Sequence, residues 1–139
     1  MLAINFWAVI VAAVAAFVIG FLMHGPIAGK LWMKLANIVP TGNEKLSDMY
    51  GQMIKNFIAN IVTSIALALV ILFAQTSGLL SDSALCTGLL VAFIAWIGFI
   101  VTSTSIDVIW MGKSAKLWLF EAGSSLITFL AMGAILGAW

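Results

Sequence analysis

The sequence is poor in charged residues, which make up 8% of its 139 positions, whereas a typical soluble domain has about 25%. Hydrophobic residues make up 64%. A soluble domain of this size cannot bury so many, because much of a small protein's surface faces outward. A water-soluble domain is therefore excluded. Disorder is excluded as well, since it requires low hydrophobicity and high charge.

Arginine is absent, and six lysines against five acidic residues leave a net charge of +1, too little for nucleic-acid binding. Cys86 is the single cysteine, so neither an intrachain disulfide nor a cysteine metal site is expected. The P-loop, G-x-S-x-G and H-E-x-x-H motifs do not occur. We therefore expect no catalytic residues, no cofactor, no metal and no nucleic-acid partner.

Long apolar runs dominate what remains. They cover approximately residues 6–23, 57–74, 85–105 and 117–139. At about 1.5 Å per residue, a helix of about 18 residues reaches ~27 Å, close to the ~30 Å apolar core of a bilayer. A backbone inside lipid must satisfy its own hydrogen bonds, and the alternation typical of barrel strands is missing. We predict an all-α polytopic membrane protein, with one transmembrane domain over residues 1–139 and four transmembrane helices.

The lysines indicate how the chain is oriented. All six fall in the loops 24–56 and 107–116, which four spans place on the same side of the membrane. Loops rich in lysine stay in the cytoplasm. We therefore expect a protein of the bacterial inner membrane, with both termini outside the cytoplasm and the loop 24–56 inside.

The loop 24–56 contains an amphipathic segment. Apolar residues recur at helical spacing over 27–38, which predicts a short helix in the membrane interface that ends before Pro40. The next helix is expected to begin near Gly42 and to run to Gln75. The short helix supplies the candidate contacts to lipid headgroups: Lys30, Trp32 and Lys34.

Small residues mark two candidate packing faces, because close backbone approach holds helices together in lipid. The first span has a small residue at every fourth position, and the last span has one G-x-x-x-G: Ala8, Ala12, Ala16 and Gly20, then Gly133 and Gly137. The partner is either another helix of this chain or a second copy. We expect a homo-oligomer, with a dimer favoured, surrounded by membrane lipids.

Glu121 is the most notable single residue, because it lies about one turn inside the last span, where an ionisable group is often functional. Its expected partner is His24, which ends the first span at the same membrane level. Ser124, Ser125 and Thr128 continue from Glu121 along one helix face. The candidate polar site is Glu121, His24, Asp107, Asn56, Asn60 and Ser125.

Two ordinary explanations compete with this site. Glu121 could be an interfacial carboxylate stabilised by the helix N-terminus. His24 could be a polar end of the first span, ahead of a helix that starts near Pro26. The sequence leaves both explanations open.

Two stretches resemble a known family. Residues 20–34 contain a glycine at the end of the first helix, Pro26, and then Gly-Lys-x-Trp-Met at 29–33, and residues 110–118 provide a second match. The sequence resembles domain-of-unknown-function family 1761, small bacterial membrane proteins. It departs from that family at Met23 and His24, where the family has Trp-Tyr. The resemblance implies four membrane helices and no particular activity.

Three functions remain for such a protein. The favoured one is a small oligomeric transporter or channel-like protein with a polar site near Glu121. The alternative is a lipid-binding or structural membrane protein without transport activity. An enzyme is least favoured, because no convergent catalytic set is found.

Overall fold

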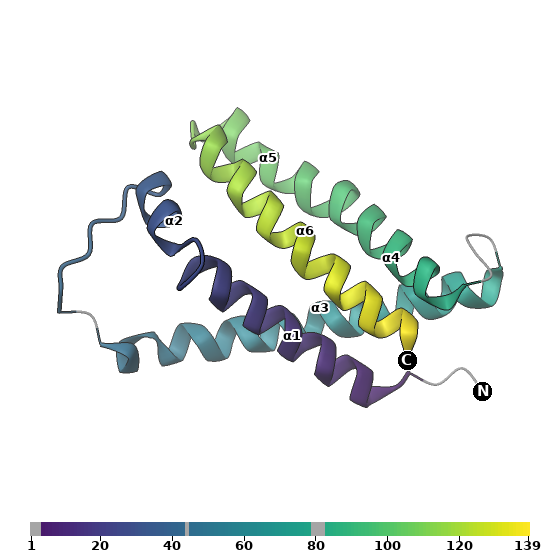
Figure 1. Ribbon diagram of the computed structural model, residues 1–139. Helices are drawn as coiled ribbons and strands as arrows, with labels where there is room; N and C mark the ends of the chain where they lie inside the picture. Colours follow the sequence, from purple (N-terminus) through teal and green to yellow (C-terminus); the bar gives the residue numbers. More distant parts are fainter. Residues whose placement is uncertain (1–3, 44, 79–82) are drawn as a thin grey trace.

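The computed structural model describes residues 4–43, 45–78 and 83–139, and within them every regular element is a helix. The long helical segments pack together (Figure 1). The elements are α1 (Phe6–His24), α2 (Gly29–Leu35), the 3₁₀ turn η1 (Leu46–Met49), α3 (Tyr50–Ser77), α4 (Ala84–Ala95), the π-helical segment η2 (Trp96–Val101), α5 (Thr102–Ile109) and α6 (Ala115–Ala138).

Four segments are long and apolar enough to span a membrane: Phe6–His24, Tyr50–Ser77, Ala84–Ile109 and Ala115–Ala138. The predicted fold class, an all-α protein with four transmembrane helices, is confirmed. The helices α1, α3, α4 and α6 form a bundle in which neighbours contact each other around a ring. The start of α1 and the end of α6 lie at one end of the bundle, and α2, the start of α3 and the turn after α5 lie at the other (Figure 1). We call these the terminal end and the lysine end.

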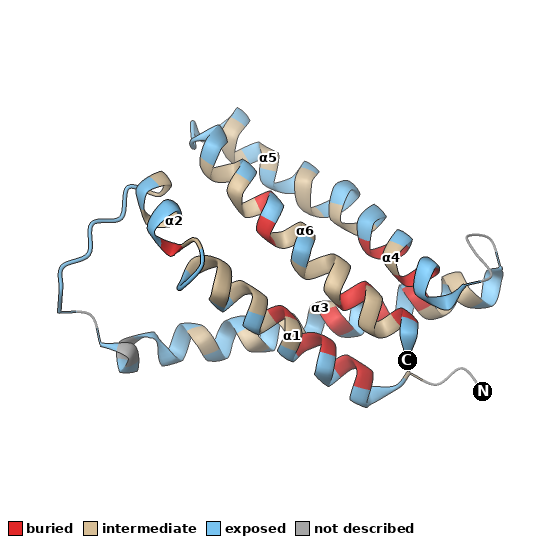
Figure 2. Cartoon of the chain, in the orientation of Figure 1, coloured by how far each residue is buried: buried red, intermediate tan, exposed pale blue. Residues whose placement is uncertain are grey.

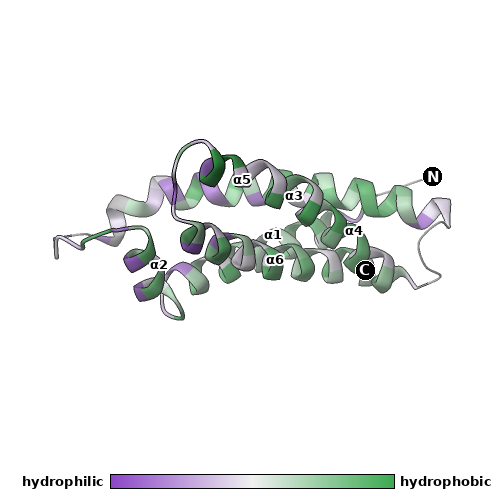
Figure 3. Cartoon of the chain, turned by 90° about the horizontal axis from the view of Figure 1, so that it is seen from above, coloured by the Kyte–Doolittle hydropathy of each residue, from purple (hydrophilic) through white to green (hydrophobic). Residues whose placement is uncertain are grey.

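Hydropathy separates the middle of the bundle from the lysine end. Figure 3 shows hydrophobic residues along the middle of the four long helices and hydrophilic residues on α2 and near the start of α3. Many large apolar side chains are exposed on the outside, among them Val62, Phe99 and Leu119. Lipid is the solvent that such a surface requires.

The buried residues gather toward the terminal end (Figure 2). Their core contains alanines of α1, a valine and an alanine of α4, and larger residues of α3 and α6: Ala12, Ala16, Leu67, Ile71, Val91, Ala92 and Met132. Ser64 is fully buried there, and its hydroxyl donates a hydrogen bond to the Val9 carbonyl at 2.9 Å. A polar side chain thus links α3 to α1 where no water is available to it.

The closest helix contact joins α4 and α6 through glycines. A Cβ atom on Gly133 would lie 2.5 Å from the Ala92 Cβ and 2.5 Å from the Gly88 carbonyl oxygen. A Cβ atom on Gly137 would lie 2.7 Å from the Ala84 carbonyl oxygen. Only glycine fits at these positions, and its absent side chain lets the two backbones touch.

The loop before α3 differs from the prediction. A helix beginning near Gly42 was wrong, because Gly42 has a φ of +78° and α3 begins at Tyr50, after η1. The short helix α2 ends at Leu35, so it stops several residues before the point at which Pro40 would end it. Asn37 has a φ of +54°, and the Ile38 amide donates to the Met33 carbonyl at 2.9 Å. This is a Schellman ending with asparagine in the left-handed position.

The third span runs without a break through α4, η2 and α5, so it is longer than the predicted 85–105. Its hydroxyl residues bond back to carbonyls one turn earlier: Thr102 Oγ1 donates to Gly98 at 2.5 Å and Thr104 Oγ1 to Ile100 at 2.7 Å. These bonds satisfy the hydroxyls within the helix. The π-helical turn that precedes them has no signal in the sequence.

Candidate functional site

A cavity of about 430 Å³ opens between α1, α3 and α6 toward the lysine end. Its size falls within the range of small-molecule sites, about 300–1,000 Å³. Its lining comes from α1 with the following Gly25, from α2, from η1 and from the two long helices: Ala16, Phe17, Gly20, Phe21, His24, Gly25, Trp32, Met49, Met53, Asn56, Asn60, Thr63, Glu121, Ser124, Ser125, Thr128, Phe129 and Met132. The lining is therefore both apolar and rich in hydrogen-bonding groups.

Side-chain size helps to explain why a cavity forms here. The buried positions of α1 nearer the terminal end are alanines and one valine, whereas Phe17 contacts Phe57 of α3 edge to face, with ring centroids 5.8 Å apart. Alanine lets helices approach closely, but a pair of phenylalanine rings separates them. Toward the lysine end, α1 and α3 are therefore held further apart, which leaves space beside the polar face of α6.

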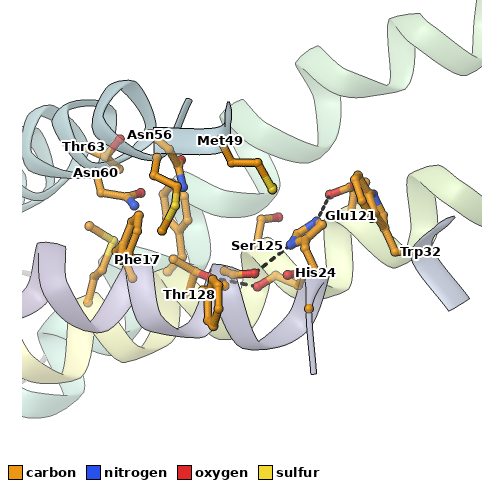
Figure 4. Close-up of a pocket in the computed structure, with 18 residues that line it drawn as sticks. Phe17, His24, Trp32, Met49, Asn56, Asn60, Thr63, Glu121, Ser125 and Thr128 are labelled. Carbon is orange, nitrogen blue, oxygen red and sulfur yellow. Dashed lines mark hydrogen bonds and ion pairs between the residues drawn. The ribbon is translucent and has the colours of Figure 1, made fainter. Parts of the chain in front are cut away.

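Glu121 takes part in two hydrogen bonds at one end of this cavity (Figure 4). Its Oε2 lies 2.9 Å from His24 Nε2, and its Oε1 accepts the indole N–H of Trp32 at 2.8 Å. The side chains of His24 and Glu121 are 32% and 44% exposed, so the pair is partly open to its surroundings. Three elements, α1, α2 and α6, therefore meet at one carboxylate.

The proton positions around His24 follow from its partners. Its Nδ1 lies 2.9 Å from the Gly20 carbonyl oxygen, which can only accept, so Nδ1 carries a proton. The contact between Nε2 and Glu121 then needs one proton, held by either the imidazole or the carboxyl group. The pair is a histidinium with a carboxylate or a neutral histidine with a carboxylic acid, and its net charge is zero in both.

Aromatic rings fix the His24 imidazole from two sides. The Trp32 ring lies 5.3 Å away, between centroids, and the Phe120 ring 5.7 Å away, both edge to face. These contacts limit rotation of the imidazole. The His24 imidazole is therefore held in one orientation toward Glu121.

The described residues do not form a metal site. No group of three or more histidine, cysteine, aspartate or glutamate side chains comes together within 4–43, 45–78 and 83–139. His24 and Glu121 already bond to each other. The arrangement is suited to holding a proton and a hydrogen-bonding ligand.

The structure brings together five of the six candidate polar residues. Glu121, His24, Asn56, Asn60 and Ser125 all line the cavity. Asp107 does not, because its carboxylate lies 2.7 Å from Lys113 Nζ in the turn before α6. The two residues form an exposed ion pair, and pairs of this kind contribute little to stability.

The candidate lipid contacts separate into two groups. Lys30 and Lys34 are exposed on α2, as a headgroup contact requires. Trp32 turns inward instead and bonds to Glu121. An interfacial tryptophan was expected here, and the structure makes it a cavity residue.

The candidate packing residues also separate. Ala8, Ala12 and Ala16 are buried in α1, and Gly133 and Gly137 contact α4. Gly20 does neither, since a Cβ atom there would meet nothing within 4 Å. Gly20 lines the cavity, and its carbonyl orients His24.

Several cavity residues were not among the candidates, including Ser124, Thr128 and Thr63. The spacing of Glu121, Ser124, Ser125 and Thr128 on one face of α6 was the available signal. Trp96 is not among the described lining residues, but its indole N–H lies 3.0 Å from both the Ser125 hydroxyl and the Ala122 carbonyl, a contact that the sequence did not predict. No pattern in the sequence pairs η2 with α6.

Comparison with known proteins gives the family and nothing beyond it. Neither a curated protein nor a solved structure matches the sequence. A family model described as "Protein of unknown function (DUF1761)" matches residues 7–137, which covers the cavity and all of the four spans except Phe6 and Ala138. The chain therefore belongs to this family, and the resemblance noted in its sequence is confirmed.

Proposed function

We propose that this protein is a small membrane transporter whose binding site is the cavity beside Glu121. The observation that carries the proposal is the combination of a cavity of about 430 Å³ with a preformed His24–Glu121 pair in its wall. Ionisable side chains inside membrane spans commonly serve ion or substrate pathways. Toward the terminal end, the core around Ile71 and Met132 closes the bundle, so access is from the lysine end.

The pair gives the site a means of carrying a proton. One proton lies between His24 Nε2 and Glu121 Oε2, and the Trp32 N–H stabilises the carboxylate form. A ligand that displaces Trp32 would weaken that stabilisation and favour the carboxylic acid. Binding in the cavity and the position of the proton are coupled in this way.

The orientation and assembly of the transporter belong to the same proposal. The lysine end faces the cytoplasm of a bacterial cell, both termini lie outside, and the protein is an inner-membrane dimer. Four spans that are closed at one end leave no path through a single subunit, so a second copy or a rearrangement completes it. External amine labelling of intact cells tests the orientation: labelling of Lys34 or Lys113 would contradict it.

Proton flux in proteoliposomes tests the transport proposal. A potassium diffusion potential set by valinomycin drives protons, and an enclosed pH dye reports their entry. We expect flux for the wild-type protein and its loss in Glu121→Gln, which keeps the side-chain shape but cannot exchange the proton. Asp107→Asn is the matched control, because Asp107 is also an acid at this end but lies outside the cavity. Absence of wild-type flux, or equal flux in Glu121→Gln, would contradict the proposal.

Lipid binding without transport is the second candidate, and one observation favours it. Lys30 and Lys34 are exposed on α2, directly beside the tryptophan that reaches into the cavity. A lysine near an anionic surface contributes about 1 kcal/mol. On this alternative, purified protein retains anionic lipid, and the double variant Lys30→Ala with Lys34→Ala retains less. No enrichment of anionic lipid in the purified protein would remove this candidate.

A further inference from the structure

The lining of the cavity indicates which chemical class of ligand it takes, and this inference rests on the binding site proposed above. The side chains of Asn56 and Asn60 line it, and neither has a hydrogen-bond partner among the described residues. Ser124 lines it as well; this residue is 4% exposed, and its hydroxyl likewise has no partner in the described part of the chain. In a membrane such groups are costly unless they are paired. They are available to hydrogen-bond a ligand.

The charges around the cavity cancel. Among its described lining residues, the titratable groups are His24 and Glu121, and they bond to each other with one proton between them. The second carboxylate oxygen accepts from Trp32, and no lysine is among the lining residues that the structure describes. An anion would find no cation to pair with, and a cation would find a carboxylate that is already paired. A charged ligand would lose its hydration without compensation, which costs several kcal/mol.

The rest of the lining is apolar. Phe17, Phe129 and Met132 face the cavity from α1 and α6, and Met53 faces it from α3. Methionine side chains adapt to ligands of different shape. These walls favour a ligand with an apolar body, whereas a small polyol or sugar would leave them in contact with hydroxyl groups.

We infer that the cavity binds an uncharged amphiphile. Its hydroxyl, carbonyl or amide head hydrogen-bonds Asn60 and Ser124, and its apolar body lies against Phe17, Phe129 and Met132. This ligand class differs from a phospholipid headgroup and from an inorganic ion, both of which carry charge.

Photolabelling with a matched series of probes tests the inference. Three diazirine probes share one medium-length alkyl chain and carry an alcohol, a carboxylate or a trimethylammonium head. The full-length protein is labelled in nanodiscs of phosphatidylcholine, and adducts are mapped by mass spectrometry. For each probe, adducts on cavity residues are divided by adducts on lipid-facing residues such as Phe99, which is 73% exposed, and this ratio corrects for partition into lipid. We expect the ratio for the alcohol to exceed the other two at least about tenfold, or ~1.4 kcal/mol.

Two variants locate the head of the ligand. Asn60→Leu and Ser124→Ala should each lower the alcohol ratio, and Val62→Leu should leave it unchanged, because Val62 is 61% exposed on the lipid side of α3. The wild-type series remains decisive if a variant does not fold. A preference for the carboxylate or the ammonium probe, or equal ratios for all three, overturns the inference. Selective alcohol labelling without proton flux would overturn transport alone, and flux with equal ratios would overturn the ligand class alone.

Discussion

The two ends of the bundle are built from different residues and serve different purposes. At the terminal end, alanines of α1 and glycines of α4 and α6 bring backbones into contact, and Ile71 and Met132 fill the centre. At the lysine end, Phe17 and Phe57 separate α1 from α3, and a cavity with polar residues in its wall remains. In lipid, burial of apolar surface does not hold helices together, so close packing must supply stability where it can.

The difference between the two ends explains how so small a membrane protein can hold a cavity. Unsatisfied polar groups and empty volume both cost free energy. Both free-energy costs arise at the lysine end, and the close contacts between helices at the terminal end offset them. Changes at the terminal end should therefore alter folding, whereas changes at the lysine end should alter what the cavity binds.

The largest effect is expected for Gly133→Leu. A side chain there would collide with Ala92 and with the Gly88 backbone, which cannot move aside. Overpacking of this kind costs about 3 kcal/mol or more, since backbone must shift. Thermal unfolding in detergent, followed by circular dichroism, measures the loss. Gly123→Leu on the same helix is the control, because a Cβ atom there meets nothing within 4 Å. Equal losses in both variants would show that the α4–α6 contact does not matter.

Glu121→Leu should have the next largest effect, because it leaves His24 Nε2 and the Trp32 indole without their hydrogen-bond partner. The expected loss of stability is about 1–2 kcal/mol, reduced by the partial exposure of the pair. Loss of the bond to Trp32 should also free α2, which limited proteolysis after the lysines of α2 would detect. Asp107→Asn should change stability by less than ~1 kcal/mol. If Glu121→Leu unfolds and is cleaved like the wild-type protein, the three-way contact is not formed in solution.

Ser64→Ala removes the hydroxyl that joins α3 to the Val9 carbonyl of α1. Hydrogen bonds between membrane helices contribute about 0.6 kcal/mol on average and up to ~1.7 kcal/mol. We expect a loss in this range, measured by unfolding in detergent. Thr76→Ala is the matched control, because its hydroxyl bonds only within its own helix. A larger loss in Thr76→Ala would contradict the assignment.

The smallest change in stability is expected for Gly20→Ala, and it should be a gain rather than a loss. Gly20→Ala places a methyl group where nothing lies within 4 Å, and alanine favours a helix over glycine by up to about 1 kcal/mol. We expect a slight gain in thermal stability, whereas Gly133→Ala should lower it. A loss in both variants would mean that Gly20 packs as the terminal glycines do, which removes the distinction between the two ends.

Sequence reasoning predicted the parts of the fold that composition controls. Apolar runs of sufficient length predicted four membrane spans, and the structure has them. The predicted start of α3 was wrong. Apolar residues after Gly42 recur at helical spacing, which is compatible with a helix, but the left-handed backbone at Gly42 depends on the loop as a whole. The π-helical turn at Trp96 was invisible for a similar reason.

The candidate site was predictable only in part. Glu121 and His24 could be paired from membrane depth alone, since both lie near the same end of antiparallel spans. Trp32 could not be assigned to them, because an interfacial tryptophan and an inward one have the same sequence signature. Gly20 shared the spacing of the packing alanines, but the Phe17–Phe57 contact separates the helices near it. Such three-dimensional spacing depends on side chains far apart in the sequence.

Cysteine accessibility gives the most direct test that the lysine end encloses a hydrated cavity. In a Cys86→Ala background, single variants Asn60→Cys and Ser124→Cys are compared with Val62→Cys, which faces lipid on the same helix as Asn60. The reagent is a small, uncharged, water-soluble hydroxyethyl methanethiosulfonate applied to open membranes, and it reacts with a thiolate, which forms only where water reaches the cysteine. We expect rapid modification at positions 60 and 124 and almost none at 62. An unreactive cysteine at 124, or equal rates at all three positions, would contradict the cavity.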